Sequence, residues 1–267
     1  MTKTLAWQKY VMAAAVLVFC GLLGWFAWPH LFASSAITHL DAPLSLPAPG
    51  NEPISPIPAS VVLDDRKVAL GRRLFNDKRL SRNNTVACVN CHALELGGAD
   101  RSERSVGIDG QKGVINAPSV FNSGFNFRQF WDGRAASLEE QVSGPVNNPL
   151  ELGSNWPEVA GKLKTDAGYV ADFGKLYQDG IQPANIQEAI ATFERSLITP
   201  NSRFDKFLRG NQSAITPREM EGYRLFRNYG CVTCHQGVNI GGNMYEKFGA
   251  MGDYFKERGN ITQADQG

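Results

Sequence analysis

The chain has 267 residues and a formal net charge of +1, from 27 basic and 26 acidic side chains, and 43% of its residues are hydrophobic. This length suits two modest domains behind an N-terminal segment, each large enough to form its own core. Because the charges nearly cancel and no basic run is interleaved with aromatic residues, nucleic acid is not expected as a partner.

An apolar run near the N-terminus, from Val11 to Trp28, contains neither a charged residue nor a proline. At ~1.5 Å per residue, it is just long enough to span a bilayer as a helix. Lys3 and Lys9 precede it, which places the N-terminus in the cytoplasm and the rest outside, in the periplasm of a Gram-negative cell. We therefore expect residues 1–40 to be an inner-membrane anchor. A cleaved signal peptide is the alternative, although its apolar core is usually only ~7 to 15 residues long.

Residues 41–60 are rich in proline and poor in large apolar side chains. The prolines of this stretch stand at positions 43, 47, 49, 53, 56 and 58. Such a composition favours an extended, polyproline-like conformation over a packed element. We expect a tether that holds the following domains away from the membrane.

Three later segments have helical patterns. An acidic pair suits the start of a helix over residues 64–76, apolar residues recur on one helical face over 185–197, and a Thr-Pro cap opens a helix over 216–229. Between them, residues 97–155 lack periodicity, and a loop of that length is usually functional. No long stretch alternates in the manner of a strand, so the expected fold is mostly α.

A Cys-x-x-Cys-His motif occurs twice and contains four of the five cysteines. Its residues are Cys88, Cys91 and His92 in the first copy and Cys231, Cys234 and His235 in the second. Two thioethers at this spacing can hold one porphyrin while the adjoining histidine binds the iron, so each motif predicts a covalently attached haem c. A zinc ribbon would place its cysteine pairs only ~15 to 20 residues apart, and a redox dithiol would not explain a histidine after both pairs.

The segments that precede the two motifs resemble each other. GRRLF begins at Gly71 and GYRLF begins at Gly222, each within an expected helix. Two tandem cytochrome c-like haem domains are the simplest explanation of this repeat. We assign residues 61–200 to the first domain and residues 201–267 to the second.

Longer stretches around both motifs resemble the bacterial dihaem cytochrome c peroxidases. They are LGRRLFNDKRLS before the first motif, FWDGR in the middle region and HQGVNIGGNMYEKFG at the second motif. The resemblance implies that the first haem is peroxidatic and reduces hydrogen peroxide to water. It implies that the second haem is an electron-transfer centre that receives electrons from a small cytochrome c or cupredoxin. It also implies a periplasmic oxidoreductase with two covalent haems.

The resemblance also implies roles for individual residues. By this match His92 and His235 are the proximal iron ligands, and Trp131 lies between the haems. Gln141 and Glu151 are placed on the distal side of the peroxidatic haem. A carboxylate in a partly dry pocket can move a proton from one peroxide oxygen to the other, so Glu151 is the expected acid–base group and Gln141 the group that orients peroxide. Without the matching context, Glu151 would more often be a solvated loop carboxylate.

The chain departs from the family's pattern in two places. Ile108 stands where most members carry a histidine that binds the resting peroxidatic iron, so the first haem is expected to need no reductive activation. The chain ends at Gly267, whereas the family continues to a methionine that binds the second haem, so the resemblance implies an incomplete second domain. Asn116 follows the pattern and matches a residue that helps to bind calcium between the haem domains.

Two other functions stay open at this point. A related class of dihaem enzymes shares both haem motifs and oxidises tryptophan residues of a partner protein during cofactor maturation. A non-enzymatic dihaem electron carrier is the second alternative, but it would not need a distal acid–base group such as Glu151. Homodimer formation also stays open.

Overall fold

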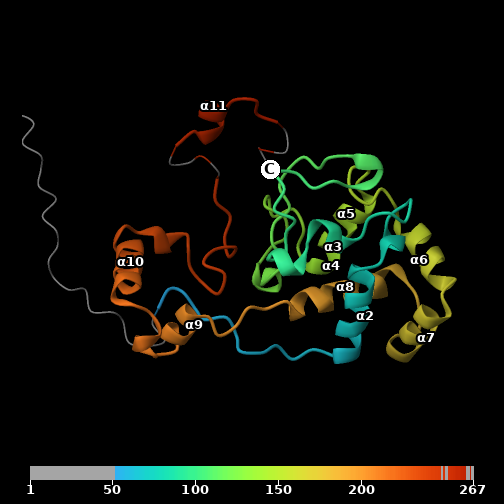
Figure 1. Cartoon of the computed structure of the whole chain (residues 1–267), viewed down its shortest axis with the longest axis horizontal. Helices are drawn as coiled ribbons and strands as arrows, with labels where there is room; N and C mark the ends of the chain where they lie inside the picture. The colour runs from blue at the N-terminus through green and yellow to red at the C-terminus, as the bar shows by residue number, and fades with distance from the viewer. Residues whose placement is uncertain (1–51, 248, 250–251, 263–264, 266–267) are drawn as a thin grey trace, which may run out of the picture. The chain divides into compact units, whose positions relative to one another are not determined.

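The computed structural model describes residues 52–247, 249, 252–262 and 265 (Figure 1). These residues form helices joined by loops, and the β-pairing among them is limited to isolated bridges. The prediction of a mostly α fold is therefore confirmed. Within the described ranges, no helix has both the length and the apolar character needed to cross a bilayer. The expected anchor and most of the tether lie outside these ranges.

Helices α2 (Asp65–Phe75) and α8 (Pro183–Ser196) form the centre of the larger core and lie side by side (Figure 1). The side chain of Asp64 caps α2 by accepting a hydrogen bond from a backbone N–H of the first turn. Gly71 allows the two helices to approach closely, because a β-carbon at that position would lie 1.9 Å from the carbonyl oxygen of Ala189. A glycine at this point is therefore a packing requirement.

Helices α6 (Trp156–Lys164) and α7 (Ala167–Leu176) complete the larger core. Its fully buried side chains include Leu74, Leu80, Ile108, Leu163, Tyr169, Phe173, Ile186 and Ile190. The loop expected over residues 97–155 is interrupted by the short helices α4 (Leu138–Gln141) and α5 (Ser143–Asn147). This region therefore has its own local structure next to the core.

The C-terminal part is built around α9 (Arg203–Leu208) and α10 (Pro217–Asn228), with α11 (Tyr254–Arg258) further along the chain. Rings on α9 and α10 pack edge to face, with the centroids of Phe204 and Tyr223 5.2 Å apart. Few apolar side chains are fully buried among the described residues of this part, so its core is small.

Residues 52–57, the described end of the proline-rich segment, are packed against this small core. Ile54 is 3% exposed and forms an isolated parallel bridge with Gly237. The backbone N–H of Ile57 donates a hydrogen bond of 2.8 Å to a carboxylate oxygen of Asp205. The sequence prediction treated this stretch as unpacked, but its backbone pairing and its buried isoleucine hold it against the domain.

The substitution Gly71→Ala tests the packing of α2 on α8. The added β-carbon would overlap the backbone of Ala189, so we expect a loss of about 1 to 3 kcal/mol in the free energy of unfolding, measured by chemical denaturation. Gly161→Ala in α6 is the matched control, because a β-carbon there meets nothing within 4 Å and alanine favours the helix by about 1 kcal/mol. Equal stability of the two variants would contradict this packing.

Candidate functional site

The first Cys-x-x-Cys-His motif lies on α3 (Cys88–Cys91), a single helical turn. The turn is fixed at its start by the side chain of Asn90, which accepts a hydrogen bond of 2.8 Å from the backbone N–H of Ala87. Neither cysteine is in a disulfide bond, so both sulfur atoms are available for a thioether bond. Burial raises the pKa of Cys88 to about 12 and also raises the pKa of Cys91, so both thiols are neutral at pH 7.

The imidazole of His92 is oriented by two backbone carbonyls. Its Nδ1 lies 3.2 Å from the carbonyl oxygen of Gly98 and 3.1 Å from that of Pro118. A proton on Nδ1 therefore leaves the lone pair of Nε2 for a metal. Burial lowers the pKa of His92 and keeps the ring in the neutral form that ligation requires. This arrangement fits a proximal ligand of haem iron.

Glu151 lies within electrostatic range of this motif, since its charge contributes to the raised pKa of Cys88 and of Cys91. Burial raises the pKa of Glu151 itself. A hydrogen bond of 2.6 Å from the side-chain amide of Asn148 and the positive charge of Arg134 act in the opposite direction. A carboxyl group whose pKa is raised in this way is a better proton acceptor than an ordinary glutamate, which suits an acid–base role.

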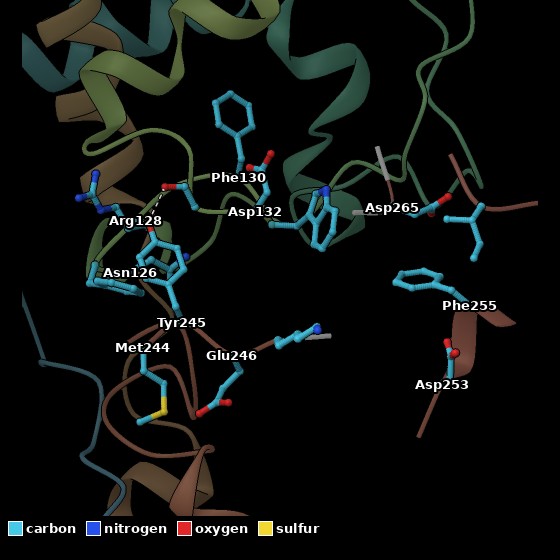
Figure 2. A pocket seen from close by; sticks show the side chains of 16 residues that line it. Asn126, Arg128, Phe130, Asp132, Met244, Tyr245, Glu246, Asp253, Phe255 and Asp265 are labelled. Atoms are coloured by element: carbon cyan, nitrogen blue, oxygen red, sulfur yellow. Dashed lines mark hydrogen bonds between the residues drawn. The ribbon is translucent and has the colours of Figure 1, made fainter. Parts of the chain in front are cut away.

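Trp131 is 44% exposed and lines an open cavity of about 690 Å³. The walls of this cavity come from the loop that contains Trp131 and from residues that follow the second motif, among them Met244 and Tyr245 (Figure 2). The hydroxyl of Tyr245 donates a hydrogen bond of 2.9 Å to the carbonyl oxygen of Gly133 and so joins the two walls. Trp131 therefore lies where segments of the two motif-bearing parts meet.

Gln141 is the last residue of α4, and its backbone N–H donates a hydrogen bond to the carbonyl oxygen of Ser137. Its side chain is half-buried. Ser137 caps the same helix by accepting a hydrogen bond from the backbone N–H of Glu140. The short helix therefore fixes the backbone from which the Gln141 amide projects.

The second motif repeats the geometry of the first with less burial. Cys231–Thr233 form a 3-10 turn, and Nδ1 of His235 lies 3.0 Å from the carbonyl oxygen of Ile240. The ring of Phe226 lies 6.0 Å from the His235 ring, and the ring of Phe75 lies 6.5 Å from that of the first motif's histidine. The phenylalanines of the GRRLF and GYRLF segments therefore contact the motif histidines in both copies. His235 is exposed and also leaves its Nε2 for a metal.

Ile108 and Asn116 have different surroundings. Ile108 is buried in the larger core, close to Gly153, where a β-carbon would lie 2.3 Å from the isoleucine Cδ1. The position at which the family's pattern has a ligand histidine is thus occupied by a core side chain. The amide of Asn116 donates a hydrogen bond of 2.6 Å to the carbonyl oxygen of Ser102. In the described part of the chain no group of three or more His, Cys, Asp and Glu could hold a metal ion, and calcium stays a prediction.

Glu194 was missed by the sequence analysis. It lies on α8, is 7% exposed, and burial raises its pKa to about 8. Its charge contributes to the raised pKa of Cys88, which places it near the first motif. The next residue, Arg195, pairs instead with Glu139 at 2.6 Å. A signal was present, because Glu194 falls on the apolar face of the helix predicted over residues 185–197.

Residues 65–213, more than half of the chain, match the family model described as di-haem cytochrome c peroxidase. The chain belongs to this family. Cytochrome c peroxidase Ccp of Escherichia coli (strain K12) is 48% identical over 218 residues, which are 81% of this chain and 46% of that protein. Cytochrome c551 peroxidase of Nitrosomonas europaea is 44% identical over 206 residues, which are 76% of this chain and 61% of that protein.

Among solved structures, the family's fold is seen in a MauG-like protein associated with microbial copper homeostasis. It is 31% identical, with a TM-score of 0.59, and the match covers 74% of this chain and 61% of that one. The chain therefore spans about half to three fifths of the length of the relatives that it matches. Family membership implies two haem groups, and the two motif histidines described above fit that requirement.

The substitution Glu194→Gln is expected to stabilise the protein above neutral pH. Because the pKa of this carboxyl is raised from 4.5 to about 8 in the folded state, the folded chain retains a proton that the unfolded chain has lost between those pH values. Stability contributed by Glu194 therefore falls as pH rises through this window, by an amount on the order of a few kcal/mol.

Denaturation midpoints of the holoprotein at about pH 5 and about pH 8 check this expectation. The Glu194→Gln variant should lose less stability between the two pH values than the unsubstituted protein. The matched control is Glu95→Gln, the same substitution at an exposed position. An identical pH dependence in all three proteins would show that Glu194 is not held protonated by the fold.

Proposed function

We propose that this protein reduces hydrogen peroxide to water with electrons from a small cytochrome c or cupredoxin, through two covalently attached haems c. The observation that carries the proposal is the half-buried carboxyl group of Glu151 near a Cys-x-x-Cys-His motif whose histidine has one ring nitrogen available. The thioether linkages would form at Cys88, Cys91, Cys231 and Cys234, and the iron ligands would be His92 and His235. Membership of the peroxidase family supports the same reaction.

Peroxide reduction consumes one hydrogen peroxide, two electrons and two protons, and releases two water molecules. Bound haem iron supplies the redox chemistry that side chains cannot perform. The role of the protein side chains is to transfer a proton. Glu151 takes it from one peroxide oxygen and returns it to the other, which then leaves as water. The amide of Asn148 holds one carboxylate oxygen of Glu151 at 2.6 Å, and Gln141 orients the peroxide.

The proposal includes the setting of the reaction. Residues 61–200 form the peroxidatic domain and residues 201–267 the electron-transfer domain, with Trp131 between the two haems. The protein is periplasmic and is held at the inner membrane by residues 1–40. The supporting features are the apolar run after two lysines and the need to attach haem covalently outside the cytoplasm.

The two alternatives have less support. The peroxidases of Escherichia coli and Nitrosomonas europaea, at 48% and 44% identity, are more similar to this chain than a methylamine utilization protein MauG at 35%, so the enzyme class that oxidises a partner's tryptophans is not favoured. A simple electron carrier has no need of a partly desolvated acid near its first motif, whereas Glu151 is half-buried there and has a raised pKa. Peroxide turnover with a reduced donor separates the peroxidase from the carrier.

The substitution Glu151→Gln tests the acid–base group. It removes the carboxylate but keeps the size of the side chain, so we expect the haem spectra to stay the same while peroxide reduction slows by about 10² to 10⁴. Steady-state oxidation of a reduced cytochrome measures the rate. Glu95→Gln, an exposed change in the same domain, should leave it unaltered. A full rate in the Glu151 variant would remove this residue from the mechanism.

Haem attachment is tested by the mass of the intact protein. We expect two haems added to the polypeptide, and the colour should stay with the protein in acid and organic solvent because thioether bonds survive that treatment. Replacing Cys231 and Cys234 by serine should leave one haem, because only the first motif then offers thiols. Haem that extracts into the solvent, or bound zinc in its place, would refute the assignment.

A further inference from the structure

Residues 52–57, here called the N-terminal clamp, contact the chain on both sides of the second Cys-x-x-Cys-His motif. On the side before the motif, the hydroxyl of Tyr223 donates a hydrogen bond to the carboxylate of Glu52. The guanidinium of Arg227, one turn further along α10, lies 3.8 Å from the same carboxylate. Helix α10 leads directly into the motif, so this carboxylate is fixed to the segment that precedes the cysteines.

On the side after the motif, the clamp pairs with Gly237 through the backbone. The N–H of Gly237 donates a hydrogen bond of 2.9 Å to the carbonyl oxygen of Pro53, and its carbonyl oxygen accepts one of 3.2 Å from the N–H of Ser55. Gly237 has φ +73, a conformation that favours glycine, and it comes two residues after His235. The clamp therefore binds both the N–H and the carbonyl oxygen of Gly237, two residues after the expected iron ligand.

The burial of the clamp shows that these contacts are part of the folded domain. The side chain of Glu52 is only 8% exposed, and Ile54 is 3% exposed. A carboxylate is buried at a high cost in free energy unless it is paired, and Glu52 is paired with a hydroxyl and a guanidinium. The clamp is also joined to α9, because Asp205 accepts a hydrogen bond from the N–H of Ile57.

Apart from the ring of Phe226, the support of His235 comes from the loop that follows it. Its side chain is exposed, and the carbonyl oxygen that contacts its Nδ1 belongs to Ile240, three residues beyond Gly237. The orientation of the ring therefore depends on the conformation of the chain from His235 to Ile240. The clamp fixes that chain at Gly237 from outside the motif.

We propose that the N-terminal clamp is a positioning element of the second haem: it fixes the loop that orients the His235 ring, and so helps to set the reduction potential of that centre. This inference rests on the proposed function, since it requires haem at Cys231 and Cys234. Groups that orient an axial ligand and control solvent access are established determinants of haem potential. A loosened clamp admits water, which stabilises the more highly charged ferric state and lowers the potential.

The test uses the full-length holoprotein with the substitutions Glu52→Gln and Ile54→Ala. Their matched controls are Glu95→Gln, which also removes an exposed acid, and Val62→Ala, which truncates a fully exposed side chain just beyond the clamp. The midpoint potentials of both haems are measured by spectroelectrochemical titration. The double variant Cys231→Ser, Cys234→Ser, which retains only the first haem, assigns the signal of that haem.

We expect both clamp variants to shift the potential of the second haem alone, with a change of about tenfold in its ratio of reduced to oxidised forms, which corresponds to about 59 mV. Ile54→Ala lowers the potential because the loosened clamp admits water. Glu52→Gln raises it, because the lost carboxylate had balanced the charge of Arg227 and so favoured the ferric state. The first haem and both controls should keep their potentials. If Ile54→Ala does not fold, Glu52→Gln decides the question, because glutamine keeps the ability to bond with Tyr223 while removing the charge that faces Arg227.

Two results would overturn the proposal while leaving the proposed function intact. One is a lower thermal stability with unchanged potentials, which would make the clamp a purely structural element. The other is an equal shift of both haems, which would indicate general loosening of the fold. A protein whose mass shows no haem at the second motif would instead overturn the proposed function, and the role of the clamp with it.

Discussion

The close contact between α2 and α8 is the constraint on which the first motif depends. Gly71 allows this contact because it has no β-carbon to meet the backbone of the partner helix. The pair then brings Phe75 of α2 against Phe193 of α8, with ring centroids 5.2 Å apart, and Phe75 also faces the ring of His92. Because α8 carries Glu194, the same contact places a buried acid near the cysteines. The close approach of α2 and α8 thus positions both the phenylalanine rings beside His92 and the carboxyl group of Glu194 near the cysteines.

Different contacts hold the two Cys-x-x-Cys-His motifs in place. The first lies beside the larger core, where two carbonyl oxygens orient His92 and burial keeps the ring neutral. The second has a small core and an exposed His235, and its flanks are joined by residues 52–57 from a distant part of the chain. This difference in burial suits two haems with different tasks, since burial and hydrogen bonding tune the potential.

Local features of the sequence predicted the helices that lead into the motifs. Asp64 and Thr216 cap α2 and α10 as expected, and each helix ends within about one residue of its predicted limit, because a cap depends on neighbouring residues alone. The pairing of Ile54 with Gly237 could not be predicted, because proline-rich composition indicates an extended chain and says nothing about a distant partner. The burial of Glu194 was predictable only in part. The sequence shows an acidic residue on the apolar face of a helix, but it does not show how completely that face is covered.

We propose that two protein-bound haems deliver a pair of electrons to hydrogen peroxide. The most direct test of this proposal adds one equivalent of hydrogen peroxide, without oxygen, to the fully reduced holoprotein while the absorption spectrum is followed. We predict that both haems become oxidised together, because one peroxide takes up two electrons to form two waters. A spectrum that stays fully reduced after the addition would contradict it.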